Sequence, residues 1–241
     1  MKKILCILMA LLLAASFAAC SKKKDVEDDL SKYLQDEEVV EKVKFESGDV
    51  FYIDTVDTTT VIVKGYEGSP ELHALTIPAT LAGKRVIGIG EKAFYYCNTI
   101  TSVEIPDSVT SIGAYAFAGC SFLETLTLPT SVKTIGEHAF YGCERLASLT
   151  IPAGALAEIP EACFWGCEKL TSVTIPGNVK VVGKGAFFAC ENLATLVVEN
   201  GVEEIRAQAF QNLSKLASVT LPDGITCDPL AFAGTPWGEG K

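Results

Sequence analysis

Histidine is scarce in this sequence, which has only His73 and His138 among its 241 residues. A Ser- or Cys-based catalytic triad needs a histidine held between its nucleophile and an orienting partner. His138 falls in a variable, surface-type position of an internal repeat, and His73 lies before the first regular copy of that repeat. No phosphate-binding or dinucleotide-binding glycine motif is present. We therefore expect no catalytic residue, no cofactor and no enzymatic activity.

Positive charge is also in deficit, because 20 Lys and Arg residues face 30 Asp and Glu residues for a net charge of −10. An acidic exterior repels phosphate backbones. We therefore expect no nucleic-acid partner.

Long apolar runs are absent apart from one, which extends from Ile4 to Ala19 after a Met1-Lys2-Lys3 start. The run is too short for a stable transmembrane span and is typical of an export signal. The small residues before Cys20 resemble the lipobox of bacterial lipoproteins, although Phe17 stands where that family usually has Leu. The resemblance implies a signal peptide at residues 1–19 and a lipid on Cys20, which would hold a soluble domain at a membrane surface. Ordinary secretion with a spare cysteine is the alternative.

Residues 20–44 are dense in charge and predict a tether after the lipid anchor. The segment from Lys22 to Asp29 resembles the charged sequences that follow the lipidated Cys in some surface-exposed lipoproteins. We therefore expect an exported protein at the cell surface or outer membrane, in contact with the membrane only through its lipid.

An internal repeat fills most of the remaining chain. A phenylalanine recurs at steps of 23, 23, 24, 23, 23 and 22 residues, at Phe94, Phe117, Phe140, Phe164, Phe187, Phe210 and Phe232. A period in this range is the signature of stacked supersecondary units, each of which cannot bury its apolar face alone. The repeat therefore predicts a solenoid.

Each repeat contains two apolar residues separated by one residue of opposite orientation, as a half-buried strand requires. These pairs are Val103/Ile105, Leu126/Leu128, Leu149/Ile151, Val173/Ile175, Leu196/Val198 and Val219/Leu221. Stacked coils would align them in one parallel sheet. The recurring Gly113, Gly136 and Gly183 are expected to turn the chain with a positive φ. The Ala-Phe pair that follows predicts a short helical, 3₁₀ or irregular segment.

The ends of the repeat array are atypical, as the open ends of a solenoid require. Alternating segments around Phe51 and Val61 predict a β-hairpin. We assign residues 45–90 to an N-terminal cap with a first irregular repeat, and residues 91–230 to regular repeats of about 23 residues. Residues 231–241 are assigned to a C-terminal cap, in which Trp237 covers the last coil.

Five cysteines keep the repeat period, each three residues after the phenylalanine: Cys97, Cys120, Cys143, Cys167 and Cys190. Parallel side chains on coils about 4.8 Å apart leave their Cβ atoms beyond the ~3.5–4.5 Å usual in a disulfide. We expect a ladder of buried thiols that pack as small apolar groups. No metal site is expected, because paired C-x-x-C units are missing.

The order of apolar strand, Pro, Ile-Gly and Ala-Phe-x-x-Cys resembles the BspA-type class of leucine-rich repeats from about Leu72 to Trp237. The resemblance implies a right-handed leucine-rich-repeat solenoid with a parallel sheet and short helical or irregular segments opposite. It also implies display outside the cytoplasm and adhesion to proteins or host surfaces. The sequence departs from the pattern at Pro160, Arg206 and Leu213.

Three rows of side chains are candidate binding surfaces. The first follows each repeated phenylalanine and carries the aromatic residues Tyr95, Tyr141, Trp165 and Phe188, which either bind a partner or pack on one another. The second is the outward face of the sheet, with Ser102, Glu104, Thr125, Thr127, Ser148, Thr150, Ser172 and Thr174. Its alternative explanation is β-propensity with hydroxyl ladders. The third row, Glu144, Glu168 and Glu191, could attract Ca²⁺, but Arg145 and Lys169 beside it favour a solvated ridge of mixed charge.

These patterns favour a lipid-anchored, non-enzymatic adhesion or protein-interaction module whose partner is a protein, such as a host or extracellular-matrix ligand. The alternative is a glycan-binding accessory lipoprotein in polysaccharide capture, with the aromatic row as its binding surface.

Overall fold

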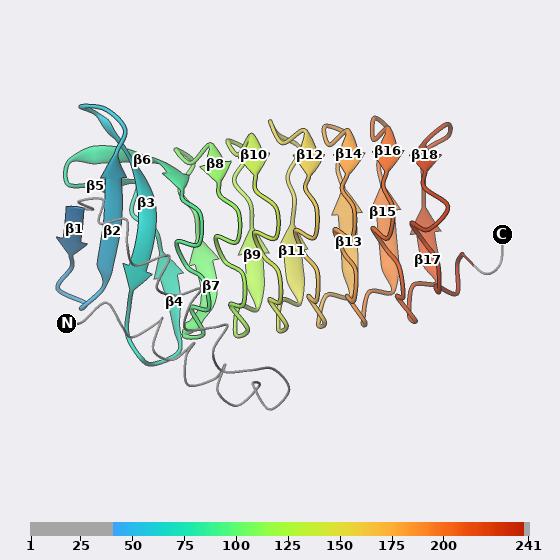
Figure 1. The fold of residues 1–241 in the computed structure, drawn as a ribbon, viewed down its shortest axis with the longest axis horizontal. Helices are drawn as coiled ribbons and strands as arrows, with labels where there is room; N and C mark the ends of the chain where they lie inside the picture. The colour runs from blue at the N-terminus through green and yellow to red at the C-terminus, as the bar shows by residue number, and fades with distance from the viewer. Residues whose placement is uncertain (1–40, 239–241) are drawn as a thin grey trace, which may run out of the picture.

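The computed structural model describes residues 41–238, which form eighteen strands stacked as an elongated solenoid. Figure 1 shows the coils side by side along the long axis, with the amino-terminal strands at one end and β17 and β18 at the other. The predicted signal peptide and Cys20 lie outside the described residues. Between residues 41 and 238 there is no helix, and so none long and apolar enough to cross a membrane.

The predicted strand pairs form one row of parallel strands, confirming the solenoid. The row is built from β4 (His73–Thr76), β7 (Ile100–Glu104), β9 (Thr125–Thr127), β11 (Ser148–Thr150), β13 (Ser172–Ile175), β15 (Thr195–Val198) and β17 (Ser218–Thr220). Register follows the repeat, since Leu126 is opposite both Val103 and Leu149. Each coil therefore sets the position of the next.

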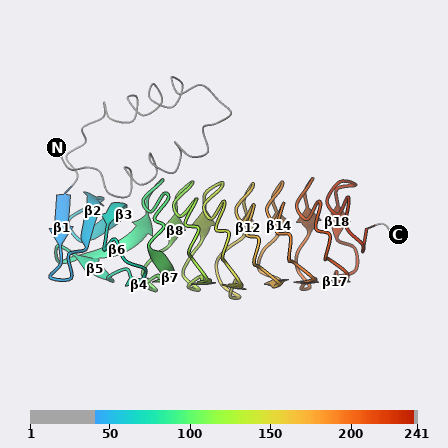
Figure 2. The same cartoon turned by 90° about the horizontal axis from the view of Figure 1, so that it is seen from below.

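A second, narrower row of parallel strands forms just before the recurring glycines, where no strand was predicted. Its strands are β6 (Lys84–Ile89), β8 (Ser111–Ile112), β10 (Thr134–Ile135), β12 (Glu158–Ile159), β14 (Val181–Val182), β16 (Glu204–Ile205) and β18 (Thr226–Cys227). Figure 2 shows the two rows along different sides of the coils. The apolar residue of each short strand is buried in all coils but the last, where Cys227 is half-buried.

Antiparallel strands precede the coils. β2 (Val50–Thr55) pairs with β3 (Thr60–Glu67) as the predicted hairpin, and β5 (Thr80–Leu81) pairs with β6. β3 then pairs with β6 in parallel. β1 (Glu41–Lys44) pairs with β2, so the sheet begins inside the segment predicted as tether, which ends at residue 44. The charge density of this segment did not reveal the strand, because the charges of β1 lie on exposed positions of an edge strand. The capping role of this region stays a prediction.

The repeated phenylalanines form a buried stack through the centre of the coils, here called the Phe ladder. The first six members are 0% exposed. Successive ring centroids are 4.8 to 5.3 Å apart, with ring planes within 16° of parallel. Tyr66 lies against Phe94 at one end and Trp237 against Phe232 at the other, with centroid distances of 5.4 and 4.7 Å. The aromatic column therefore runs the length of the solenoid core.

The segments around the Phe ladder are tight turns and not helices. Positive φ recurs two residues before and two residues after each of the first six ladder phenylalanines, as at Lys92 and Tyr96, both at 55°. A right-handed helix cannot pass through such residues. The Phe94 N–H instead donates to the Ala116 carbonyl of the next coil at 2.7 Å, while the Tyr95 N–H donates within its own turn to Lys92 at 3.1 Å. Every second backbone amide of a turn therefore donates a hydrogen bond to the next coil.

The explanation predicted for Gly113, Gly136 and Gly183 is wrong, because none of them has a positive φ. A Cβ atom at Gly136 would lie 2.2 Å from the Ala114 nitrogen, and at Gly113 it would lie 2.5 Å from the Glu91 nitrogen. Backbone atoms cannot approach a carbon that closely without a shift of the coil. These glycines are therefore required by the close approach of neighbouring coils.

The cysteine ladder is confirmed. Cys97, Cys120, Cys143, Cys167 and Cys190 are at most 1% exposed, and every cysteine in the described range is free. The thiols also donate hydrogen bonds, which the sequence did not predict. The Cys120 sulfur is 3.1 Å from the Phe94 carbonyl oxygen, and the Cys190 sulfur is 3.2 Å from that of Phe164. The thiols thus link neighbouring coils.

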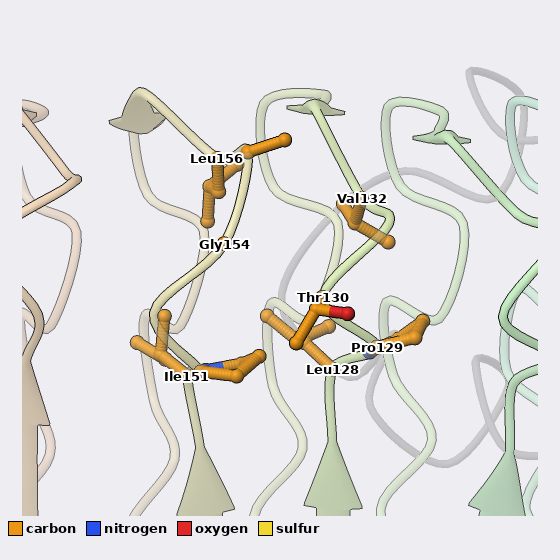
Figure 3. A pocket seen from close by; sticks show the side chains of 9 residues that line it. Leu128, Pro129, Thr130, Val132, Ile151, Gly154 and Leu156 are labelled. Carbon is orange, nitrogen blue, oxygen red and sulfur yellow. The ribbon is translucent and has the colours of Figure 1, made fainter.

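The coil that is one residue longer interrupts both parallel rows. β11 pairs with β9 but not with β13, and β12 pairs with β14 but not with β10. The turns stay joined, because the Phe140 N–H donates to the Cys163 carbonyl at 2.9 Å. Figure 3 shows the apolar crevice left between the coils, which is lined by residues including Leu128, Val132 and Leu156. The crevice is too narrow for a water molecule and offers no ligand site.

Candidate functional site

Seven ring-bearing side chains form a continuous line over the outside of the turns, here called the aromatic ridge. It consists of Tyr95, Tyr96, Tyr115, His138, Tyr141, Trp165 and Phe188. Neighbouring ring centroids along it are between 4.2 and 6.5 Å apart. The ridge crosses five consecutive turns, since its members accompany the ladder phenylalanines from Phe94 to Phe187.

The four predicted aromatic residues all lie in the ridge, but the sequence missed three others. The predicted row was broken at Ala118, which is buried. Tyr115 and His138 bridge the gap, with their rings stacked at 4.7 Å and 11° between planes. Both occupy the position two residues before the ladder phenylalanine, so a comparison of that position between coils would have found them. Tyr96 joins from the position two residues after it.

Glycines and positive φ angles position the ridge. Tyr96 lies over Gly119, where an added Cβ would be 2.6 Å from its ring, and Trp165 lies over Gly185, where the distance would be 3.2 Å. Tyr115 and His138 have φ of 55° and 59°. A left-handed backbone costs about 1–2 kcal/mol for a residue with a side chain. Inter-coil hydrogen bonds hold this conformation, such as that from the His138 N–H to the Glu161 carbonyl at 3.0 Å.

The ridge gathers much of the exposed apolar surface. Within residues 41–238 six large apolar side chains are exposed, and three of them are Tyr95, Tyr96 and Tyr141, at 39%, 40% and 39%. Trp165 and Phe188 are half-buried, with centroids 4.2 Å apart. Some rings are therefore covered by their neighbours and others face solvent, while binding of a partner by this row stays a prediction. An exposed aromatic patch of this kind is typical of an interaction surface.

The hydroxyl face of the sheet is also where the sequence predicted it. Thr125, Thr127, Ser148, Thr150, Ser172 and Thr174 are exposed, and Ser102 is half-buried. Hydroxyl ladders are not the explanation, because none of these side chains hydrogen-bonds another within the described coils. Glu104 accepts a bond from Thr76 at 3.0 Å. This face lacks the aromatic and Arg side chains that dominate protein hot spots.

The glutamate row shows no ion-binding geometry. No group of three or more His, Cys, Asp or Glu side chains in the described range could hold a metal ion. Arg145 does not pair with the row, because its guanidinium carbon lies 4.3 Å from the centroid of the Phe122 ring. Glu144, Glu168 and Glu191 are all exposed.

The residues that could support catalysis have structural partners. The His73 Nε2 is 2.9 Å from the Tyr66 hydroxyl, and its Nδ1 is 2.9 Å from the Glu71 carbonyl. Tyr66 also donates to Asp49 at 2.6 Å. Burial raises the pKa of the Cys163 and Cys167 thiols well above the usual range, which suppresses the reactive thiolate. Both ring nitrogens of His73 are therefore in contact with β3 or with its own strand entry.

The repeat, the two parallel rows and the buried ladders define a leucine-rich-repeat solenoid. Residues 87–217 match six copies of the BspA type Leucine rich repeat region, which is 131 of 241 residues and so more than half of the chain. The chain belongs to this family.

Solved structures agree with this assignment. The T. pallidum Leucine Rich Repeat protein is 32% identical, with a TM-score of 0.69 over 73% of this chain and 82% of that one. A leucine rich cell surface protein from Faecalibacterium prausnitzii is 30% identical, with a TM-score of 0.66 over 82% of this chain and 53% of that one. A leucine-rich repeat protein from Eubacterium ventriosum is 24% identical, with a TM-score of 0.67 over 80% and 50%, and shows the fold alone. The chain thus spans about half the length of the last two. No curated protein matches the chain.

Proposed function

We propose that this protein is a non-enzymatic module that is displayed at the bacterial cell surface and binds a protein partner through the aromatic ridge, as in adhesion. Membership of the BspA-type family supports a protein-interaction role. The F. prausnitzii relative is described as a cell surface protein. The apolar run that ends before Cys20 supports export with a lipid anchor at the outer membrane or cell surface.

The aromatic ridge is the observation that carries the proposal. Tyr and Trp dominate protein-binding hot spots because they bury large apolar areas while keeping a polar tip. Here several such residues lie in one contiguous line, and Tyr95, Tyr96 and Tyr141 keep more than a third of their surface exposed. The rigid turns below hold the rings in place, which lowers the entropy lost on binding.

Polysaccharide capture remains the second candidate, but the ring geometry favours a protein. A sugar ring stacks on an exposed aromatic face. Several faces in the ridge are covered by neighbours, since Tyr115 stacks on His138 at 4.7 Å and Trp165 lies 4.2 Å from Phe188. Rings covered in this way offer fewer free faces to a sugar, and the Tyr hydroxyl groups suit the mixed contacts of a protein interface.

The test is a binding screen of the detergent-solubilised full chain against arrays of extracellular-matrix proteins and of glycans at physiological salt. We expect protein hits that weaken for the Tyr141→Ala variant. Glycan hits that are lost in Trp165→Ala would establish polysaccharide capture in their place. If Tyr141→Ala and Trp165→Ala both leave the protein hits unchanged, the aromatic ridge is not the binding surface.

A further inference from the structure

The aromatic ridge already holds one cation of the protein itself. The Lys92 ammonium nitrogen lies 5.7 Å from the centroid of the Tyr115 ring, within the range in which the negative face of an aromatic ring attracts a cation. The same lysine lies 3.7 Å from a Glu91 carboxylate oxygen. One end of the ridge therefore shows, within the chain, the combination of ring and carboxylate that recognises a cationic side chain.

The same combination recurs along the ridge without a cation. Glu144, Glu168 and Glu191 each follow a ridge aromatic by three residues, and Glu137 directly precedes His138. Three residues span at most about 11 Å. All four glutamates are exposed, and none forms an ion pair within residues 41–238. Exposed carboxylates therefore lie within three residues of a ridge ring on three of its five turns.

The nearby basic residues form no ion pair with these carboxylates. Arg145 lies over the Phe122 ring, and Lys184 pairs with Glu161 at 3.5 Å. Lys169 forms no ion pair with a described residue. The Coulomb attraction of the four glutamates for a charge on a partner acts over about 8 Å at physiological salt, which is of the order of the distances along one turn.

We infer that the segment of the partner protein that binds the aromatic ridge is cationic, with Arg or Lys side chains placed over the rings and between the glutamates. This inference rests on the proposed function and adds the chemistry of the partner. Aromatic faces attract guanidinium and ammonium groups, and the carboxylates accept their hydrogen bonds. An acidic or neutral segment would lack both interactions.

The test uses short synthetic peptides in which Arg alternates with Leu, and matched peptides with citrulline or Glu in place of Arg. Citrulline keeps the shape of Arg and removes its charge. We expect the Arg peptide to bind the detergent-solubilised full chain at least about tenfold more tightly than the citrulline peptide, and the Glu peptide not to bind. Raising the salt from about 0.15 M to about 1 M should remove most of that difference, because screening shortens to about 3 Å.

Two charge-matched variants locate the effect. The triple variant Glu144→Gln, Glu168→Gln and Glu191→Gln should weaken binding of the Arg peptide about tenfold, as three exposed charge pairs of ordinary strength would. The control variant Glu46→Gln, Glu71→Gln and Glu124→Gln removes the same charge from exposed positions elsewhere. It should leave binding within about twofold. Equal losses in both variants would reduce the effect to net charge and overturn the inference.

Failure of the cationic-partner inference can be distinguished from failure of the proposed function. If a matrix-protein hit weakens for Tyr141→Ala but is unaffected by salt and by the triple variant, the ridge is a protein-binding site and the cationic partner is wrong. If no protein hit depends on Tyr141, the proposed function itself fails.

Discussion

Substituting glycines in equivalent turns tests whether the coils are held by close backbone approach. In Gly136→Ala the new Cβ would lie 2.2 Å from the Ala114 nitrogen and 2.6 Å from its Cα. Both are backbone atoms, so two coils must separate to admit the methyl group. We expect this variant to lower the free energy of unfolding by about 3 kcal/mol, the upper range for overpacking a well-filled site.

A second glycine provides the matched control. Gly166 has a φ of 72°, and a Cβ added there would meet its nearest atom at an ordinary 3.7 Å. Gly166→Ala should therefore cost only the left-handed backbone conformation, about 1 kcal/mol. The reverse change, Ala189→Gly at the equivalent turn position with φ 57°, should stabilise the protein by about the same amount.

Urea denaturation followed by circular dichroism measures all three variants, with free energies compared only where the m-values agree. The reasoning predicts the order Ala189→Gly above the wild type, then Gly166→Ala, then Gly136→Ala. If Gly136→Ala costs no more than Gly166→Ala, the coils are not in close contact at this position and the account of these glycines is refuted.

Three further predictions follow from the ladders and turns. Phe164→Ala should destabilise the protein by about 3–5 kcal/mol in the same denaturation assay, because its ring is fully buried between two ladder rings; a loss below about 1 kcal/mol would contradict a continuous stack. A thiol reagent should modify half-buried Cys227 in the native protein far faster than Cys167, because burial and a raised pKa suppress the Cys167 thiolate. Peptide mapping after labelling identifies the modified residue. Modification of Cys167 at an equal rate would argue against the thiol ladder. The pKa of Asp57 is lowered to about 2, chiefly by the hydrogen bond from the Thr59 N–H. Asp57 should therefore stabilise the hairpin at pH values above its ordinary pKa of 3.8 and lose that contribution as the pH falls towards 2. Asp57→Ala should flatten the acid limb of the profile of melting temperature against pH, and an unchanged limb would show that the bond is absent.

The solenoid could be predicted because the repeat period is visible from the spacing of the phenylalanines in the sequence alone. The strand pairs were also predictable, since alternation of apolar residues at Leu126 and Leu128 states which side chains face inward. The second row of short strands was missed because each strand holds a single buried residue, such as Ile112 or Ile135. No alternation can be detected over two residues.

The turns could not be predicted because their geometry depends on neighbouring coils. Ala-Phe after a glycine is compatible with a helix, and only the positive φ angles at Lys92 and Tyr96 exclude one. Likewise, the sequence suggests that Gly136 is needed for a turn. The structure shows that glycine is needed there because the backbone of Ala114 in the preceding coil leaves no room for a Cβ atom. Local patterns do not report contacts made between coils.

The aromatic ridge was predicted only in part, because it too depends on contacts between coils. Tyr141 and Trp165 share one position of the repeat and were found by aligning it. Tyr115 and His138 share another position, and the structure joins the two rows because the rings of neighbouring turns touch. A site that crosses coils diagonally is visible only when side chains from several positions are placed together.

The central claim is that this protein binds a protein partner through the aromatic ridge. The most direct measurement is the Kd of a matrix-protein hit for the wild type, for Tyr141→Ala and for Leu230→Ala, which removes another exposed apolar side chain at 52% exposure away from the ridge. The account predicts about a 30-fold loss for Tyr141→Ala, as for a hot-spot residue worth about 2 kcal/mol, and no change for Leu230→Ala. Full binding by Tyr141→Ala, together with a loss on Thr127→Ala in the sheet face, would contradict it.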